Sequence, residues 1–164
     1  VLMLLVSASG WAQNILAEKS PFAITEAVIY VDNGEPELVK TAATLLQQDI
    51  ERVTDRKIPI VTSINQVRKN VIVIGTLSES ALLKQLVARK KLDVKTIQGT
   101  WEASLTQMVK NPMPGVAQAL VIAGNDRRGA AYGVFELSKQ FGVSPWYWWA
   151  DVPVAKRFLN SSSA

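Results

Sequence analysis

Three short apolar runs constrain the fold of this 164-residue chain most strongly. They are "AVIYV" (Ala27 to Val31), "VIVIG" (Val71 to Gly75) and "ALVIAG" (Ala119 to Gly124). The first is rich in β-branched residues and is closed by the turn signal "DNG". Such runs are typical of strands, and the third is predicted to be buried. The chain is therefore predicted to build a β-sheet from them.

Helices are predicted in segments that lie between or after these runs. In the first helix apolar residues recur at helical spacing, at Leu38, Ala42, Leu45, Leu46, Ile50 and Val53. Ser78 is predicted to cap a second helix, whose apolar residues are Leu82, Leu83, Leu86 and Val87. Asp126 is predicted to cap a third, which ends at Gly142 and whose core face is Ala130, Val134, Leu137 and Phe141.

Two further strands complete the predicted sheet. One is "IPIV" (Ile58 to Val61). The other runs from Thr100 to Val109 with period two, and its predicted inward side chains are Trp101, Ala103, Leu105 and Val109. The turn "NPMPG" after it predicts a hairpin, with the next strand antiparallel. The predicted fold class is α/β (α+β), a mixed sheet of about five strands with helices packed on it.

Four residues at the start of the third helix are unusual. Gly129 and Gly133 lie one turn apart, and each lowers helix propensity by about 1 kcal/mol relative to alanine. We interpret them as sites of close packing against the sheet rather than of ligand approach. Arg127 and Arg128 oppose the helix dipole. They are either part of an ion pair within the domain, or a site that binds an anion or docks an acidic neighbouring domain.

Composition excludes several kinds of chemistry. The chain has neither cysteine nor histidine, which removes thiolate nucleophiles and the two commonest zinc ligands. Its net charge of +4 comes from scattered Lys and Arg residues without interleaved aromatics, so no nucleic-acid partner is expected. The segment "GNDRRGAA" lacks the Lys-Ser/Thr of a phosphate loop. No motif proposes a catalytic carboxylate pair, and we expect no cofactor, no metal and no catalytic residue in this chain.

The N-terminal residues suggest export. Residues 1–12 begin with a short apolar run and end in "GWA", which resembles the end of a secretory signal peptide before Gln13. A buried N-terminal strand is the alternative. We expect a signal remnant at 1–12, a linker at 13–22, a domain at 23–154 and a tail at 155–164. The predicted location is secreted or periplasmic in a bacterium, with no membrane contact after signal cleavage.

The segment "SPWYWWADVP" (Ser144 to Pro153) places four large rings in adjacent positions. One buried face of a strand or helix cannot cover all of them, because adjacent side chains point in different directions. The rings can anchor a domain interface, fill a core or stack on a sugar. The candidate substrate-binding or domain-interface residues are Trp146, Trp148, Trp149, Asp151, Arg127 and Arg128.

The stretch "LVIAGNDRRGAAYGVFELSKQFGVSPWYWWADVPV" (Leu120 to Val154) resembles the end of the N-terminal domain of glycoside hydrolase family 115, the xylan α-1,2-glucuronidases. The resemblance implies a domain similar to the second domain of β-hexosaminidases, followed by a (β/α)8 barrel that carries the catalytic residues and would be its partner. It also implies a non-catalytic role in supporting inverting hydrolysis by that barrel, with glucuronoxylan as a possible ligand. A free-standing carbohydrate-binding module for acidic glycans is the alternative.

Overall fold

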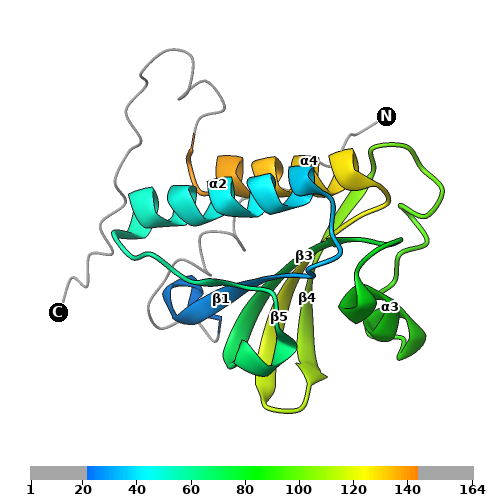
Figure 1. The fold of residues 1–164 in the computed structure, drawn as a ribbon, viewed down its shortest axis with the longest axis horizontal. Coiled ribbons are helices and arrows are strands. Elements are labelled where there is room, and N and C mark those ends of the chain that lie inside the picture. The colour runs from blue at the N-terminus through cyan, green and yellow to red at the C-terminus, as the bar shows by residue number, and fades with distance from the viewer. Residues whose placement is uncertain (1–21, 144–164) are drawn as a thin grey trace, which may run out of the picture.

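A five-stranded sheet in the order β2-β1-β3-β5-β4 forms the centre of the computed structural model, which describes residues 22–143 (Figure 1). The strands are β1 (Ala27–Val31), β2 (Ile60–Val61), β3 (Lys69–Thr76), β4 (Ser104–Met113) and β5 (Val116–Gly124). Parallel pairs join β1 to β2, β1 to β3 and β3 to β5. Only β4 runs antiparallel, paired with β5 at the edge of the sheet. The prediction of a mixed sheet is thus confirmed.

Helices cover both faces of this sheet. α2 (Glu37–Thr54) and α4 (Arg127–Gln140) lie side by side on one face, as Figure 1 shows. α3 (Ala81–Ala88) packs on the other face. Two single-turn 3-10 helices, η1 (Ile24–Glu26) and η2 (Ile64–Gln66), complete the described elements.

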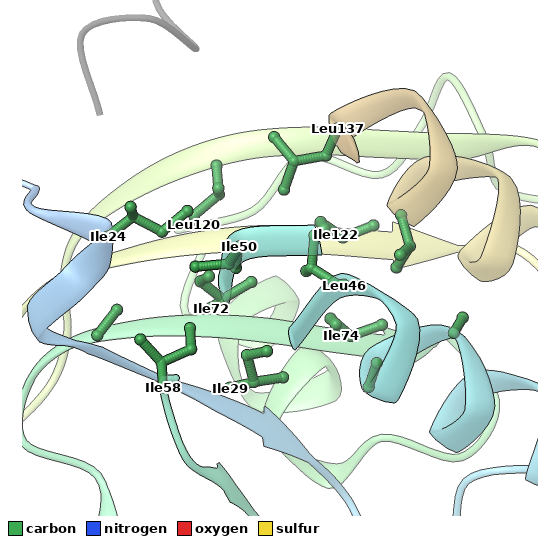
Figure 2. Packing of buried hydrophobic residues seen from close by; sticks show 14 of the residues in the cluster. Ile24, Ile29, Leu46, Ile50, Ile58, Ile72, Ile74, Leu120, Ile122 and Leu137 are labelled. Carbon is green, nitrogen blue, oxygen red and sulfur yellow. The ribbon is translucent and has the colours of Figure 1, made fainter. Parts of the chain in front are cut away.

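Each face of the sheet has its own apolar cluster, because side chains along a strand alternate between the two faces. In β3, Ile72 and Ile74 pack beneath α2 and α4, together with Leu46 and Ile122 (Figure 2). The intervening residues of β3, with Leu83 and Leu86 of α3, belong to the other cluster. This double burial explains why β3 and β5 appear in the sequence as continuous apolar runs.

The predicted helix faces need two corrections. α2 begins at Glu37 and buries Val39, whereas Leu38, predicted for the core, is 40% exposed. The helical spacing was right, but its phase at the first turn was wrong. α3 begins at Ala81, so its cap is Ser80, whose Oγ accepts a hydrogen bond from the Leu83 amide at 3.3 Å. Ser78 was the predicted cap and lies before that position.

The predicted strand from Thr100 to Val109 was wrong in its first half. β4 begins at Ser104, and Trp101, predicted to face the core, is 74% exposed. Glu102 has φ of 55°, outside the extended region, because residues 100–103 form a loop against the start of α4. The predicted turn was also misplaced: β4 continues through Met113 with a register shift after Lys110, and the hairpin turns between Met113 and Val116.

The ends of α4 agree with the sequence prediction. Asp126 is the N-cap, and its side chain accepts hydrogen bonds from the Arg128 and Gly129 amides. Gly142 follows the helix with φ of +89°, and its amide donates to the carbonyl of Lys139. A residue in this left-handed region ends a helix at little conformational cost only when it is glycine.

Several predictions fall outside the described residues. They include the signal remnant at 1–12, most of the linker at 13–22, the tail at 155–164 and the aromatic segment at 144–153. Phe22, at the end of the predicted linker, is buried in the cluster under α2 and α4. Within residues 22–143, no helix combines the length and the apolar character needed to cross a bilayer.

Candidate domain interface

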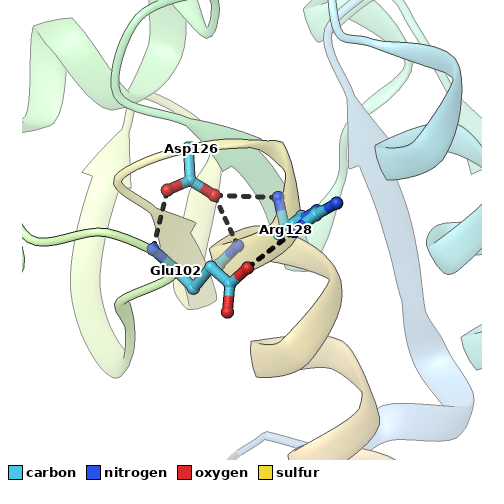
Figure 3. Close-up of polar contacts among 4 residues, drawn as sticks. Glu102, Asp126 and Arg128 are labelled. Carbon is cyan, nitrogen blue, oxygen red and sulfur yellow. Dashed lines mark hydrogen bonds and ion pairs between the residues drawn. The ribbon is translucent and has the colours of Figure 1, made fainter.

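The first turn of α4 is tied to the loop before β4 by a polar network (Figure 3). Asp126 Oδ1 accepts from the amides of Arg128 and Gly129, both at 2.9 Å. Its Oδ2 accepts from the amide of Glu102 at 2.7 Å. The Arg128 guanidinium then donates back to Glu102 Oε1 at 2.9 Å. One capping side chain therefore fixes both the helix end and the loop.

This network sets the ionisation of Asp126. Partial burial acts to raise the pKa of Asp126, but the hydrogen bonds from three backbone amides and the charge of Arg128 outweigh it and hold the pKa below its ordinary value. The hydrogen bond and ion pair with Glu102 raise the pKa of Arg128, so the charged forms of Asp126 and Arg128 are both favoured. Asp126 is thus a structural anion and keeps its charge at mildly acidic pH.

Close packing at two glycines lets α4 approach the sheet. A Cβ added at Gly129 would lie 2.2 Å from the carbonyl oxygen of Ala103, and one added at Gly133 would lie 2.7 Å from Cγ2 of Ile122. Neither distance can accommodate a side chain without movement. The interpretation of both glycines as packing sites, made from their spacing on the helix, is therefore supported by the contacts.

The structure places the two predicted arginines differently. Arg128 makes the ion pair within the domain that the sequence offered as one alternative. Arg127 is exposed, and no hydrogen bond or ion pair links its side chain to any other residue between 22 and 143. Within that part of the chain, the charge of Arg127 at the start of α4 has no acidic partner.

An aromatic stripe on α4 was missed by sequence reasoning. Tyr132 and Phe135 are 49% and 44% exposed, although α4 is packed against the sheet along its opposite side. Spacings of four and three residues align Arg128, Tyr132 and Phe135 on one helix face. Trp101 is the neighbour of Glu102, which pairs with Arg128. We call these four exposed residues, Trp101, Arg128, Tyr132 and Phe135, the α4 surface.

The signal for this stripe was present in the sequence. Tyr132 and Phe135 fall between the core positions of the helix, where an isolated surface helix carries polar residues. The sequence analysis assigned the core face correctly but did not ask what the other face carries. Exposed aromatic residues that gather on one face are typical of a surface that a partner covers.

The carboxyl ends of β1 and β3 carry a second set of acidic side chains. Glu35 is 3% exposed, and Thr76 donates to it from its amide at 2.8 Å and from its hydroxyl at 3.0 Å. Asp32 accepts from the amide of Ala81 at 3.1 Å. Burial raises the pKa of Glu35, opposed by the two bonds from Thr76. Both carboxyl groups therefore hold loops in place.

Among residues 22–143, no group of three acidic side chains is placed to hold a metal ion. The remaining candidate residues, Trp146, Trp148, Trp149 and Asp151, lie outside the described residues. Their predicted role in an interface or a sugar site stays a prediction.

The fold and its polar network define an α/β domain, and comparison with solved structures shows what this domain is similar to. This chain is similar to BtGH115A, described as a family GH115 4-O-methyl-α-glucuronidase with specificity for decorated arabinogalactans. The two share 30% identity over 80% of this chain, with a TM-score of 0.65. CpGH84D matches 74% of this chain at 19% identity and a TM-score of 0.51, which shows the fold alone.

Each match covers only a small part of the other protein. This chain spans 16% of BtGH115A and 18% of CpGH84D. No family model and no curated protein matches the sequence. The chain therefore has a fold that occurs in larger glycoside hydrolases, of which it corresponds to a small part.

Proposed function

We propose that this chain is a non-catalytic accessory domain of a secreted glycoside hydrolase similar to the family 115 α-glucuronidases, and that it supports a catalytic barrel. The observation that carries the proposal is the alignment of most of this chain with 16% of a much longer enzyme at 30% identity. An accessory role agrees with Asp32, Glu35 and Asp126, each of which holds a loop or a helix end.

The α4 surface is the proposed contact with that barrel. Trp101, Tyr132 and Phe135 expose apolar area that a covering domain would remove from water. Trp146, Trp148, Trp149 and Asp151 follow α4 along the chain and are proposed to extend the same interface. Arg127 offers a free cation at its border, suited to an acidic residue of the partner.

Two measurements on this chain test the accessory role. Incubated with 4-O-methylglucuronic acid-decorated xylooligosaccharides, the 164-residue protein should release no uronic acid; release above a buffer blank would refute the proposal. The gene should also encode further residues after Ala164. A mature product that ends there would equally refute it.

Fluorescence quenching tests the interface itself. Iodide quenching of the wild type and of Trp101→Phe isolates the signal of Trp101, which is 74% exposed in this chain. In the longer product of the same gene, Trp101 should become several-fold less accessible to iodide. Equal accessibility in the two proteins would show that the α4 surface is not covered by the rest of the enzyme.

A further inference from the structure

A basic basin lies at the edge of the sheet opposite to the start of α4. It is formed by the beginning of β3, the turn between β4 and β5, and the residues that follow α3, and its volume is about 870 Å³. Four cations line it: Arg68, Lys69, Arg89 and Lys91. No acidic residue is among its lining residues. The cations that looked scattered in the sequence therefore converge in the fold.

Most of this positive charge is not neutralised within residues 22–143. Arg68 donates to the carbonyl oxygens of Asn65 and Val67, at 2.6 and 2.9 Å, and Lys91 donates to the carbonyl of Asn111. These partners orient the two side chains but carry no formal charge. Lys69 alone has an acidic partner, Glu26, in an exposed ion pair that solvent screens.

The backbone around the basin has rare dihedral angles and two register shifts. Lys69 and Asn111 have φ of 49° and 47°, which non-glycine residues rarely adopt, and Gly115 has φ of 80°. The strand register shifts at Lys69 in β3 and after Lys110 in β4. Bulges of this kind bend a strand and redirect its side chains. Residues in rare backbone conformations cluster at binding sites more often than elsewhere, which agrees with a binding surface here.

We propose that the basic basin binds a short acidic oligosaccharide through its carboxylate groups. Arg and Lys pair well with carboxylates, and the open space of about 870 Å³ beside these cations leaves room for a short oligosaccharide. Met113 and Val116 add apolar lining against which a sugar ring can pack. No aromatic residue lines the basin, so it lacks the stacking platform that single-stranded nucleic acids use.

The inference does not depend on the accessory role proposed above, because the basin and the α4 surface lie at different edges of the sheet. It is tested by titrating the full chain with tetragalacturonate in a calorimeter at low salt. Saturable binding with one site is expected. The same tetrasaccharide with methyl-esterified carboxyls is the matched ligand control, and it should bind at least tenfold more weakly because its charge is gone.

Variants locate the site. The double variant Lys69→Gln/Arg89→Gln removes two exposed basin charges, and it should weaken binding of tetragalacturonate at least tenfold. The control Arg127→Gln/Lys139→Gln removes two charges from α4 and should bind like the wild type. Far-UV circular dichroism of both variants checks that they are folded.

Four results would overturn the proposal: no binding of tetragalacturonate, equal binding of its methyl ester, a loss of affinity that follows the α4 variant instead, or tighter binding of an oligothymidylate with the same number of charges. The last result would assign the basin to nucleic acid rather than to an acidic glycan.

Discussion

Gly129→Ala is the substitution for which the structure makes the sharpest prediction. The new Cβ would lie 2.2 Å from the Ala103 oxygen and 3.0 Å from the Ala103 carbonyl carbon, both backbone atoms. Ordinary contact begins at 3.4 Å, so α4 and the loop must separate by about 1 Å. A flexible side chain could move away, but a backbone carbonyl that also accepts a hydrogen bond from Asn125 at 2.9 Å cannot do so freely.

The expected magnitude follows from three opposing contributions. Overpacking of this kind costs about 1–3 kcal/mol. Separation also weakens two hydrogen bonds, Asn125 to Ala103 and Glu102 to Asp126, each worth about 0.5–1.5 kcal/mol net. Alanine improves helix propensity by about 1 kcal/mol. The free energy of unfolding should therefore fall by about 3 kcal/mol, within limits of about 1 and 5 kcal/mol.

Urea unfolding of the full chain, followed by far-UV circular dichroism, measures this change. Gly34→Ala is the matched control, because a Cβ at Gly34 meets no atom within 4 Å and its φ is not in the positive range. That control should be unchanged or stabilised by about 0.4–1 kcal/mol. If Gly129→Ala were as stable as Gly34→Ala, the close approach of α4 to residues 102–103 would be wrong.

Three further predictions concern single groups. Asp126→Ala should lower the free energy of unfolding by about 2 kcal/mol, because it removes the helix cap and the acceptor of the Glu102 amide. Asp126→Asn keeps a capping oxygen and should lower it by less. Equal losses for the two variants in urea titrations would argue against capping. Burial raises the pKa of Glu35 above its ordinary 4.5, so the stability this group contributes is full below that value and is lost as pH rises through the raised pKa. Glu35→Gln does not titrate at this position, so it should lose less stability than the wild type as the pH rises above 4.5. Parallel slopes of unfolding free energy against pH in the two proteins would contradict this. Gly142→Ala should lower the free energy of unfolding by about 1–2 kcal/mol, because φ at this position is +89°, even though no atom would obstruct the new Cβ. An unchanged melting curve would show that the turn after α4 relaxes.

Much of the fold could be predicted because burial on both faces leaves a strong pattern. β3 and β5 are buried along almost their whole length, so their runs of Val, Ile and Ala have few competing interpretations. The capping residue Asp126 and the terminator Gly142 act through local backbone geometry, which a few residues of sequence can specify.

The sequence predictions were wrong where contacts between distant segments determine the local backbone. The alternation around Trp101 predicts a strand, but the loop of residues 100–103 is held by Asp126 and Arg128, which lie more than twenty residues later. Pro112 stays within β4 because the register shift leaves room for a residue without an amide hydrogen. No local pattern contains these partners.

The candidate site was predictable only in part, for the same reason. Arg128 was singled out by its position against the helix dipole, but its partner Glu102 becomes visible only when the loop folds onto α4. The basic basin draws its cations from two separate segments, residues 68–69 and 89–91, which the sequence presents as scattered charge. Neither Lys69 nor Arg89 is unusual by itself.

The two ends of the sheet expose different kinds of side chain to a partner. At the carboxyl ends of the parallel strands, the acidic groups Asp126 and Glu35 are satisfied by backbone amides, so the surface open to a partner is chiefly aromatic. At the opposite edge the cations are oriented mainly by carbonyls and keep their charge. Apolar area favours a permanent, desolvated contact, whereas exposed cations favour a reversible and salt-sensitive one. A domain of this fold can therefore attach to a neighbour through α4 while the basin remains accessible to an acidic ligand.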